Sequence, residues 1–535
     1  MLKFLRAGIC SALLLTILQG CGGCSAPGPN EACEPDQAEA CGEHDFALSC
    51  LPVQDGSYAC LNPLGGRCDL SDDYCAPGAE CQPDAEGTAR CLLTESAACD
   101  MDEDFCAGGL VCAAVGDDEY QCHPHVFVQG VVFDSENLDP IEGAHIIAFN
   151  EEGSALSDVA VSDANGIYTL SLPAVRDEEG SPIQQFFTLR VGAANYQTFP
   201  SGIRQAQPID ASQANDLEEG YVIDTAQTDV ALIPLPEEEQ GFPSIRGRVD
   251  IEGGLGGVLV VAEADADTGF SAVSARDGAF AIFNVPPGEY EVRGYIADYQ
   301  IEPTAVSMDD ERIVDVILTR SEAGIKDLAG QIQIVSAHGS LRSSVVLVVA
   351  STFDEISVRG EVPAGLRAPR TGTPNINGEW TIEGVPAGDY YVLAGFENDQ
   401  LVRDPDEGTA GTDLVRITVP AEGGTMNVTP SFKVTAALDT VSPGREGPEG
   451  LTERPTLTWG PYSNAQWYDL VVFDAFGNVV WEANAIPPAG GSANLSVLYE
   501  GPFEEGMYYQ FRAIAFRMSS AISSTEPLRG VFFRQ

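Results

Sequence analysis

From residue 126 onward, hydrophobic and polar residues alternate in short runs, and the runs end at Gly, Pro, Asp or Asn. Alternation with a period of two predicts β-strands that bury one face, whereas long runs with the 3.6-residue period of helices do not occur. The pattern therefore predicts an all-β fold built from tandem antiparallel β-sandwiches.

The alternating region contains an internal repeat, because three similar units follow one another along the chain. Predicted strands at 128–133, 245–249 and 328–334 open the units, and each unit later contains a turn that leads into another alternating run. The turns are Asp163-Ala-Asn-Gly166, Arg276-Asp-Gly278 and Ile376-Asn-Gly378. Asn-Gly and Asp-Gly pairs suit the positive φ angles of tight hairpins. The units are predicted at 126–235, 242–321 and 326–433.

Several segments of these units resemble one known family. They are Pro140-Ile-Glu-Gly-Ala144, Asp277-Gly-Ala-Phe280, Val285-Pro-Pro-Gly288-Glu-Tyr and Val385-Pro-Ala-Gly388-Asp-Tyr. These segments resemble the carboxypeptidase regulatory-like family, whose domains are transthyretin-type sandwiches related to stalk repeats of adhesins. The resemblance covers about residues 126–432 and implies accessory domains with scaffold or binding roles, not catalytic ones.

Some relatives in that group cross-link their sandwich with a Lys–Asn isopeptide bond, which requires a buried lysine beside an acid. The first two units contain no lysine. The third has Lys326 and Asn427, with Glu379 or Glu383 as the acid. We favour the simpler interpretation, an exposed lysine at the edge of the domain.

The segment 436–535 differs from the three units, and it resembles a fibronectin type III-like sandwich. Trp459 alternates with Leu457 and is predicted to lie in the core, as is Tyr509 in a later strand. Trp467 and Trp481 are candidate ligand platforms, because an aromatic ring can stack on a sugar face.

All fifteen cysteines precede residue 123, and twelve of them form three groups of four. The second and third groups repeat with a constant offset (68 to 99, 75 to 106, 81 to 112, 91 to 122). The groups are Cys33, Cys41, Cys50, Cys60; Cys68, Cys75, Cys81, Cys91; and Cys99, Cys106, Cys112, Cys122. Each group is too short to fold by burial alone, so the block 33–122 is predicted to form three disulfide-rich mini-domains.

The connectivity of these disulfides stays open, since four cysteines allow three pairings. The last two cysteines of each group bracket turn-forming residues, which predicts a small hairpin. Zinc is disfavoured because paired C-x-x-C spacings are absent. The acidic stretches 69–73 and 100–104 lack a spaced set of Ca²⁺ ligands, and we interpret them as solvated loops. The short acidic turn Asp265–Gly269 lacks the further ligands of a full Ca²⁺ loop, and we interpret it as the tip of a hairpin. His123-Pro-His125 is interpreted as a linker rather than a metal site.

The N-terminal segment 1–20 has a basic start and a short apolar run, as in a secretory signal. Leu18-Gln19-Gly20-Cys21 resembles the bacterial lipobox, which implies lipidation of Cys21 and a tether over 21–32. By the same resemblance Gly22 favours the outer membrane, so we expect an outer-membrane lipoprotein at the cell surface. The role of Cys24 is open.

The charge balance excludes one large class of partners. Lys and Arg number 27 and Asp and Glu 81, so the formal net charge is −54, which repels nucleic acid. Signatures of metalloproteases, serine hydrolases and phosphate-binding loops are absent, and we predict no catalytic residues, no cofactor and no metal site.

Together these patterns predict a non-enzymatic, lipid-anchored envelope protein. Its membrane contact is the lipid anchor, and its role is surface display, adhesion or scaffolding with a polysaccharide or protein ligand. The alternative is an accessory or degenerate cell-surface hydrolase that uses paired carboxylates.

Overall fold

The computed structural model describes residues 27–535 with internal gaps, so the predicted signal peptide, Cys21 and Cys24 lie outside the described residues. The gaps are 36–40, 42–46, 54–55, 72–73, 85–86, 101–104, 117–118, 152–154, 203, 218–219, 252–255, 265–267, 310–312, 336–342, 355–359, 371–374, 397–413, 430, 436, 519 and 527. Two compact units are present: Met1–Cys112 with Tyr120–Cys122, and Ala113–Glu119 with His123–Gln535. In the described part of the chain, no helix has the length and apolar character needed to cross a membrane.

The cysteine-rich block consists of successive hairpins. Its strands are β1 (Ser49–Pro52), β2 (Tyr58–Leu61), β3 (Ala79–Pro83), β4 (Ala89–Leu93), β5 (Leu110–Val115) and β6 (Glu119–Pro124), paired β1-β2, β3-β4 and β5-β6. The predicted hairpins are confirmed, with Cys50 opposite Cys60 and Cys81 opposite Cys91. The disulfides are Cys33–Cys50, Cys41–Cys60, Cys68–Cys81, Cys75–Cys91, Cys99–Cys112 and Cys106–Cys122. Every module therefore joins its first cysteine to its third and its second to its fourth.

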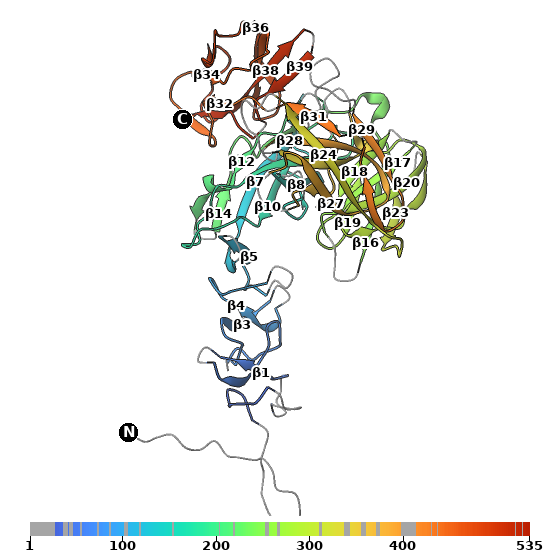
Figure 1. The fold of residues 1–535 in the computed structure, drawn as a ribbon. Helices are drawn as coiled ribbons and strands as arrows, with labels where there is room; N and C mark the ends of the chain where they lie inside the picture. The colour runs from blue at the N-terminus through green and yellow to red at the C-terminus, as the bar shows by residue number, and fades with distance from the viewer. Residues whose placement is uncertain are drawn as a thin grey trace, which may run out of the picture. The chain divides into compact units, whose positions relative to one another are not determined.

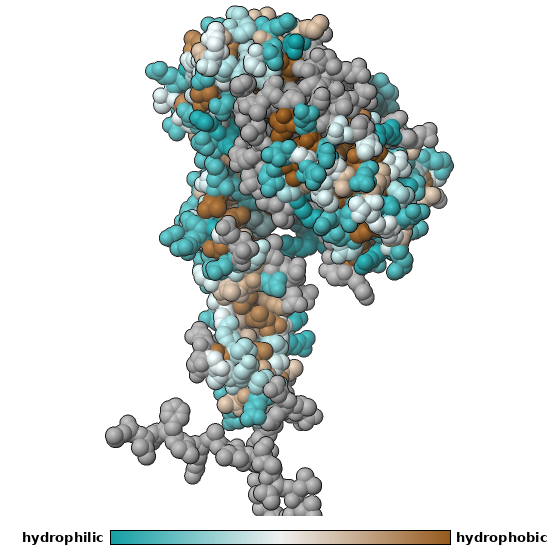
Figure 2. Space-filling model, viewed as in Figure 1, coloured by the Kyte–Doolittle hydropathy of each residue, from teal (hydrophilic) through white to brown (hydrophobic). Residues whose placement is uncertain are grey.

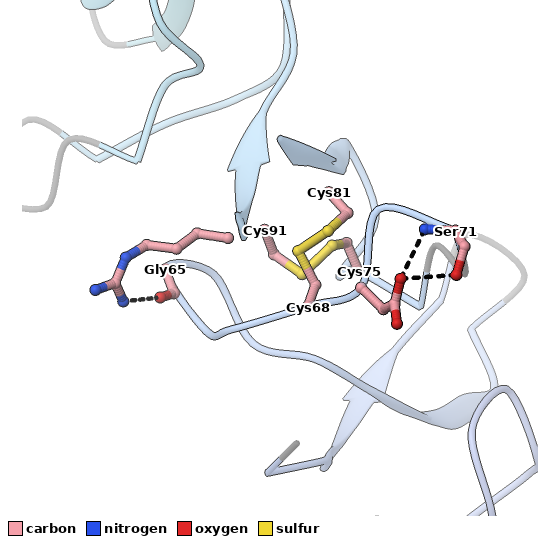
Figure 3. Close-up of a disulfide and its surroundings, with 8 residues drawn as sticks. Gly65, Cys68, Ser71, Cys75, Cys81 and Cys91 are labelled. Atoms are coloured by element: carbon pink, nitrogen blue, oxygen red, sulfur yellow. Dashed lines mark hydrogen bonds between the residues drawn. A yellow bond between two sulfur atoms is a disulfide. The ribbon is translucent and has the colours of Figure 1, made fainter. Parts of the chain in front are cut away.

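The sequence period of the second and third modules has a counterpart in the backbone hydrogen bonds between modules. Asn62 donates its amide to the Tyr74 carbonyl at 2.7 Å, and 31 residues later Leu93 donates to the Phe105 carbonyl at 2.7 Å. Figure 3 shows the middle module, where the two disulfides lie beside each other and the arginine side chain bonded to the Gly65 carbonyl is Arg90. The amides of Ala76 and Ala107 in turn donate to the Asn62 and Leu93 carbonyls, so the modules stack through a repeated pair of backbone hydrogen bonds.

The second unit contains four β-sandwiches, which we number 1 to 4 in chain order (Figure 1). The elements of sandwich 1 are β7 (Val126–Asp134), β8 (His145–Asn150), β9 (Ala160–Val161), β10 (Ile167–Leu172), β11 (Phe186–Gly192), β12 (Ile209–Asp210), η1 (Ala211–Gln213), β13 (Asn215–Leu217), β14 (Gly220–Ile223) and β15 (Val230–Leu232). One sheet has the order β10-β7-β14-β13 with β15 also on β7, and the other has the order β12-β11-β8-β9.

Sandwich 2 follows a short linker that contains η2 (Glu237–Glu239). Its strands are β16 (Ile245–Asp250), β17 (Leu259–Glu263), β18 (Gly269–Val273), β19 (Ala279–Ile282), β20 (Gly288–Ile296), β21 (Tyr299–Gln300), β22 (Thr304–Met308) and β23 (Val314–Thr319). The sheets have the orders β19-β16-β23 and β18-β17-β20-β21, and β22 also pairs with β20.

Sandwich 3 has the same arrangement. Its elements are β24 (Lys326–Val335), β25 (Ser343–Val349), η3 (Ala350–Thr352), β26 (Arg367–Ala368), β27 (Glu379–Val385), β28 (Gly388–Phe396), β29 (Val415–Val419), β30 (Gly424–Asn427) and β31 (Phe432–Thr435). The sheets have the orders β27-β24-β30, with β31 also on β24, and β26-β25-β28-β29.

Sandwich 4 has a different strand order, as its different sequence pattern predicts. Its strands are β32 (Thr440–Ser442), β33 (Glu449–Leu451), β34 (Thr456–Trp459), β35 (Trp467–Asp474), β36 (Val479–Ile486), β37 (Leu495–Leu498), β38 (Tyr508–Arg517), β39 (Ser520–Ser524) and β40 (Val531–Arg534). The sheets have the orders β32-β34-β37 and β33-β40-β38-β35-β36, with β39 also on β38. Trp459 is fully buried and Tyr509 almost so, in agreement with the prediction that both lie in the core.

Sandwiches 1 to 3 share one topology, which accounts for the sequence repeat. In each sandwich, the first strand pairs antiparallel with the strand that follows the Gly-containing turn. The first strand also pairs parallel with the last strand or strands of the same sandwich. These parallel contacts are an addition to the predicted antiparallel pairing, and they arise because the chain crosses to the second sheet before it returns. The shared Val-Pro-x-Gly-x-Tyr motif has a local role as well, since Tyr290 and Tyr390 donate to the Pro286 and Pro386 carbonyls at 2.9 Å.

A glycine in the first strand of each repeat faces an aromatic ring on the neighbouring strand. The cross-strand pairs are Gly130–Tyr168, Gly247–Phe280 and Gly330–Trp380. The ring covers the space that a side chain would occupy, so a Cβ at Gly247 would lie 2.8 Å from Phe280 Cζ and would overlap the Val316 carbonyl. Such a glycine–aromatic pair fills the sheet surface while the backbones approach closely.

The second strand of each repeat is buried on both faces. In β17, Val260 and Ala262 point into the core of sandwich 2, whereas Leu259 and Val261 belong to a core that sandwich 2 shares with sandwich 3. The strand is therefore a continuous apolar run rather than an alternating one. The repeats pack against one another through sheet faces, not only through their linkers.

Candidate functional site

A cleft lies within the second unit where all four sandwiches contribute residues. Its volume is about 300 Å³. The floor is the outer face of the β8-β11 sheet of sandwich 1, where Phe149 is opposite Thr188 and Ile147 is opposite Arg190. The same face carries the floor of an adjoining space of about 210 Å³, with Arg190, Ser271 and Glu361 lining both.

The walls of the cleft come from segments that are distant in sequence. One side is formed by residues of sandwich 1, namely Pro200, Ser201, Gly202, Gln205 and Ala206. Gly269 and Ser271 at β18 form another side, and Thr352 of η3 with the later residues Asp354 and Glu361 forms a third. Leu528 of sandwich 4 also lines the cleft. The volume is at the lower end of the range of small-ligand sites, about 300–1,000 Å³.

A three-residue polar cluster joins sandwiches 1, 2 and 3 at the cleft. Arg190 Nε donates to Glu361 Oε1 at 3.1 Å, and its Nη2 lies 3.0 Å from the same oxygen. Arg190 Nη2 also donates to the Ser271 carbonyl at 3.1 Å, and the Ser271 hydroxyl donates to Glu361 at 3.0 Å. The Arg190 side chain is 11% exposed and that of Glu361 22%, so the pair is shielded from solvent and worth more than a surface ion pair.

Removing either member of the ion pair is expected to destabilise the second unit. Arg190→Met and Glu361→Gln should each lower the free energy of unfolding by about 1–3 kcal/mol, because the partner keeps a poorly solvated charge. The double variant should cost less than the sum of the two, with a coupling energy of about 1 kcal/mol in a denaturant double-mutant cycle. Additive single effects would show that the pair does not hold the sandwiches together.

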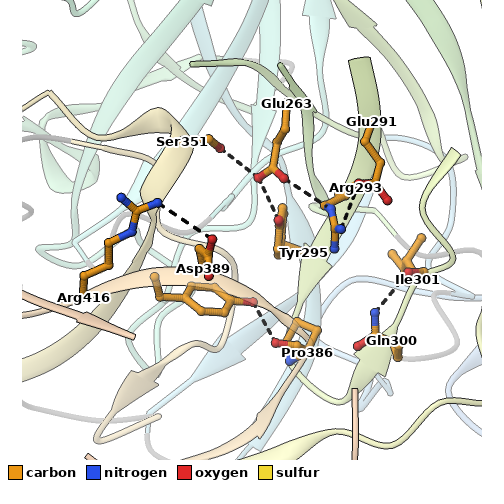
Figure 4. A network of polar contacts seen from close by, with 11 residues as sticks. Glu263, Glu291, Arg293, Tyr295, Gln300, Ile301, Ser351, Pro386, Asp389 and Arg416 are labelled. Carbon is orange, nitrogen blue, oxygen red and sulfur yellow. Dashed lines mark hydrogen bonds and ion pairs between the residues drawn. The ribbon is translucent and has the colours of Figure 1, made fainter. Parts of the chain in front are cut away.

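A second polar network fixes sandwich 3 on sandwich 2 beside the cleft (Figure 4). Glu263 accepts hydrogen bonds from the Tyr295 and Ser351 hydroxyls at 2.8 Å, and its other oxygen lies 3.3 Å from Arg293 Nε. Burial, with the Glu263 charge as a second cause, raises the pKa of Tyr295 well above its ordinary value. Tyr295 also packs edge-on against Tyr390 of sandwich 3. The hydroxyl therefore stays protonated and keeps donating to Glu263.

Sandwich 4, which contributes Leu528 to the cleft, also contacts sandwich 1. Arg204 Nη2 donates to the Phe476 carbonyl at 2.6 Å and to the Ala231 carbonyl at 2.7 Å. Phe476 packs edge-on against Phe133, and Arg512 Nη1 donates to Gln205 at 3.4 Å. The hydrogen bonds from sandwich 1 to sandwich 4 join residues 272 and 307 positions apart in the chain.

His145 lies between sandwiches 1 and 2, with its ring edge-on to Phe283 at 5.0 Å between centroids. Burial, and then the charge of Arg246, lower the pKa of His145 below its ordinary value of 6.5. The folded chain thus keeps this imidazole neutral at a pH where the unfolded chain protonates it.

The stability of the second unit is accordingly expected to fall as the pH drops below about 6.5. His145 should lower the free energy of unfolding by at most about 1.4 kcal/mol for each unit of pH. This loss ends once the pH has fallen below the lowered pKa of the folded state. The variant His145→Gln should lose less stability than the wild type between pH 7 and pH 5, in urea titrations at each pH. Parallel curves for the two proteins would contradict the assignment, and the curves above pH 7 are the control.

No protein-family model matches the sequence, and no curated protein does. Among solved structures, the chain is similar to the Bacillus anthracis TIE protein, at 10% identity and a TM-score of 0.13 over 74% of this chain and 68% of that one. It is also similar to a streptococcal ancillary pilin, at 12% identity and a TM-score of 0.14 over 57% and 99%. Two B repeat units of the collagen binding protein of Staphylococcus aureus match at 11% identity and a TM-score of 0.17 over 76% and 98%. At these TM-scores the likenesses carry no conclusion about this chain.

The two candidate platform tryptophans lie on opposite faces of one sheet. Trp467 is opposite Phe516 and stacks on it, with centroids 5.6 Å apart and an interplanar angle of 4°. Trp481 is opposite Val472 and packs edge-on against the buried Tyr499. The structure therefore does not combine the two tryptophans into one platform, and neither lines the cleft.

The other residues singled out by sequence are dispersed. Lys326 donates to the Gly423 carbonyl at 3.1 Å and is opposite Gly424, three positions before Asn427, so the two are not brought together. His125 stacks on Phe127 with centroids 5.3 Å apart. In each cysteine module three sulfur atoms lie within 4.8 Å of one another, but all are engaged in the disulfides given above.

The cleft itself was missed by reasoning from sequence. Arg190, Ser271 and Glu361 are common polar residues in three different sandwiches, and they form no sequence motif. One signal was present, namely the continuous apolar runs at the second strand of each repeat, which indicate burial on both faces. On the face shown in Figure 2, hydrophobic residues form small groups among hydrophilic ones.

Proposed function

We propose that this chain is a non-enzymatic, lipid-anchored envelope protein whose four sandwiches act as one ligand-binding body. The cleft carries the proposal, because four separate sandwiches contribute to one concave site of ligand-binding size. A protein that served only as a spacer would need no such convergence.

Two features support export and anchoring. Disulfide-stapled modules persist in oxidising compartments, and six disulfides staple the N-terminal block. Cys21 follows the apolar run in a lipobox-like context, and two or three acyl chains would anchor the chain stably. We place the protein at the outer membrane facing outward, with a polysaccharide or protein as its ligand.

Protease treatment of intact cells tests the anchored display. We expect the wild type to fractionate with the membrane and to be cleaved from outside, and Cys21→Ala to be soluble. A wild type that is membrane-bound but protected would face the periplasm, and an envelope-assembly role would replace surface binding. A wild type that is soluble would contradict the anchor itself.

The competing class, a hydrolase with paired carboxylates, makes a different prediction. It requires turnover of a glycan or peptide that a single carboxylate substitution abolishes. The cleft does contain Glu151, Asp354 and Glu361. However, Glu361 accepts from Arg190 and Ser271 and thereby joins three sandwiches, which is a structural role.

A further inference from the structure

We propose that the open edge of β23 in sandwich 2 binds an extended, cationic segment of a partner protein as an added antiparallel strand. No residue of β23 lines the cleft, so this site is separate from the one that carries the proposed function. The inference follows from three observations: the free backbone groups of β23, the place that β13 occupies in sandwich 1, and the charge of the chain.

β23 is the edge strand of the sheet β19-β16-β23, and the structure describes all six of its residues. The Thr319 carbonyl points away from β16, because it accepts the Glu302 amide at 2.9 Å. The Val316 carbonyl points the other way, toward the paired glycine of β16. Since the backbone groups of a strand alternate in direction, the amides and carbonyls of Asp315 and Ile317 face the edge. Among the described residues, these four groups have no hydrogen-bond partner.

β23 lacks the features that normally protect an edge strand. It contains no proline and no lysine, and its register with β16 runs without a bulge. Its outward side chains are exposed, with Ile317 at 66% and Ile313 just before the strand at 57%. Natural edge strands are blunted by lysine, proline, bulges or a covering segment. A regular and apolar edge of this kind is a template for strand addition.

Sandwich 1 shows what the corresponding place in the sheet can hold. There β14 pairs parallel with the first strand, β7, and β13 covers the other side of β14 in antiparallel pairing. β23 likewise pairs parallel with the first strand of its sandwich, but no strand of the described chain lies on its other side. In sandwich 3 the last strand is divided into β30 and β31, which offer no continuous edge. In sandwich 2, a strand of the partner would take the place that β13 has in sandwich 1.

The side chains at the edge and the net charge define the partner segment. A strand added to β23 places its own side chains beside Ile313 and Ile317, so aliphatic residues at alternate positions fit. Asp315 lies between them on the same face, whereas Arg246 and Arg248 lie one strand farther from the edge. A formal charge of −54 favours a cationic segment and speeds its association. The same charge disfavours a second copy of this chain as the partner.

Titration of the full chain carrying Cys21→Ala with strand-forming peptides tests this inference. The first probe is an acetylated and amidated heptapeptide in which lysine and valine alternate. In the second probe every peptide nitrogen is methylated, which keeps the charge but removes the donors that strand addition needs. In the third probe glutamate replaces lysine. We expect the first probe to bind at least about tenfold more tightly than either of the others in calorimetry.

Amide exchange locates the bound peptide. In the free chain, the amides of Asp315 and Ile317 should exchange at the rate of an open loop, because they face the edge. The amides of Val316 and Leu318 face β16 and should be protected. The first probe should slow exchange at Asp315 and Ile317 at least about tenfold and leave the other two unchanged.

Variants assign the binding to the edge of β23. Ile317→Lys should weaken the first probe about tenfold or more, because it removes an apolar contact and repels the lysines. The side chain is 66% exposed, so the midpoint of unfolding should not change. Ile317→Pro removes the outward amide without a change of charge and should weaken binding as well.

A matched control is available on the edge strand β10. Ile167 is 49% exposed, but its amide donates to Asp163 Oδ1 and its carbonyl accepts the Asp163 amide, both at 2.9 Å. No strand can add at that residue while these bonds exist. Ile167→Lys makes the same change of side chain and charge as Ile317→Lys, and it should leave the affinity unchanged.

The outcomes separate this inference from the proposed function. Equal binding of the methylated and unmethylated probes, equal loss in the β23 and β10 variants, or no binding at about 1 mM peptide would overturn strand addition. Preference for the glutamate probe would overturn the cationic partner. Protection of Asp315 and Ile317 that rises with chain concentration, without peptide, would assign the edge to a second copy and overturn the partner protein. None of these results bears on the cleft, and anchored display is judged by the protease experiment on cells.

Discussion

Gly247→Ala is expected to lower the free energy of unfolding of the second unit by about 3 kcal/mol or more. The added methyl group would overlap the Val316 carbonyl of β23 and would lie 2.8 Å from Phe280 Cζ. Both neighbours belong to strands paired with β16, so neither can move without breaking a ladder of backbone hydrogen bonds. Chemical denaturation monitored by near-UV circular dichroism measures the loss.

A matched control is available in the same class of substitution. Gly378→Ala adds a methyl group with no heavy atom within 4 Å, and Gly378 is not among the glycines with positive φ. The free energy of unfolding should stay the same or rise by up to about 1 kcal/mol, because alanine reduces the conformational entropy of the unfolded chain. Equal effects at Gly247 and Gly378 would refute the role given to the glycine–aromatic pair.

Reduction is expected to unfold the N-terminal block and to leave the four sandwiches intact. The six disulfides join residues 13 to 19 positions apart, and each bridge over such a loop contributes about 3 kcal/mol. Modules this small have little other means of stabilisation, whereas no cysteine follows residue 122. Hydrogen–deuterium exchange with and without dithiothreitol should show loss of protection only in peptides before that residue.

The thiol count of the reduced sample provides the control for that experiment. Cys60, Cys91 and Cys122 are fully buried, so complete reduction must be verified by mass before exchange is measured. Fully reduced modules that keep their protection would show that burial, not the disulfides, maintains them.

Much of the local structure follows from short-range chemistry in the sequence. Alternation predicted the strands, and the turn glycines Gly166 and Gly278 do adopt positive φ angles of 74° and 87°. The expectation was wrong at Gly378, whose φ angle is not positive. A hairpin was predicted because Cys81 and Cys91 bracket turn-forming residues, and the two cysteines do lie opposite each other on β3 and β4. These features depend on neighbours within a few residues.

The pairing of disulfides and the assembly of the sandwiches did not follow from the sequence. Four cysteines per module permit three pairings, and the selection of first to third and second to fourth depends on how each module folds around its hairpin. The cleft depends on contacts such as Arg190 with Glu361, which are 171 positions apart. Long-range packing of this kind appears in one sequence only as an indirect signal, here the unbroken apolar run Leu259-Val-Val-Ala262.

Amide exchange at the junction of sandwiches 2 and 3 tests most directly whether the sandwiches form one body around the cleft. The Ala297 amide donates to the Ala364 carbonyl at 3.0 Å, and the Asp298 amide donates to the Gly384 carbonyl at 2.8 Å. Both bonds exist only when the two sandwiches are packed together, so these amides should exchange as slowly as the core amides of β17. If these two amides exchange at the rate of an open loop while β17 stays protected, sandwiches 2 and 3 do not pack together in solution. The cleft, which needs residues from both, would then not exist in solution.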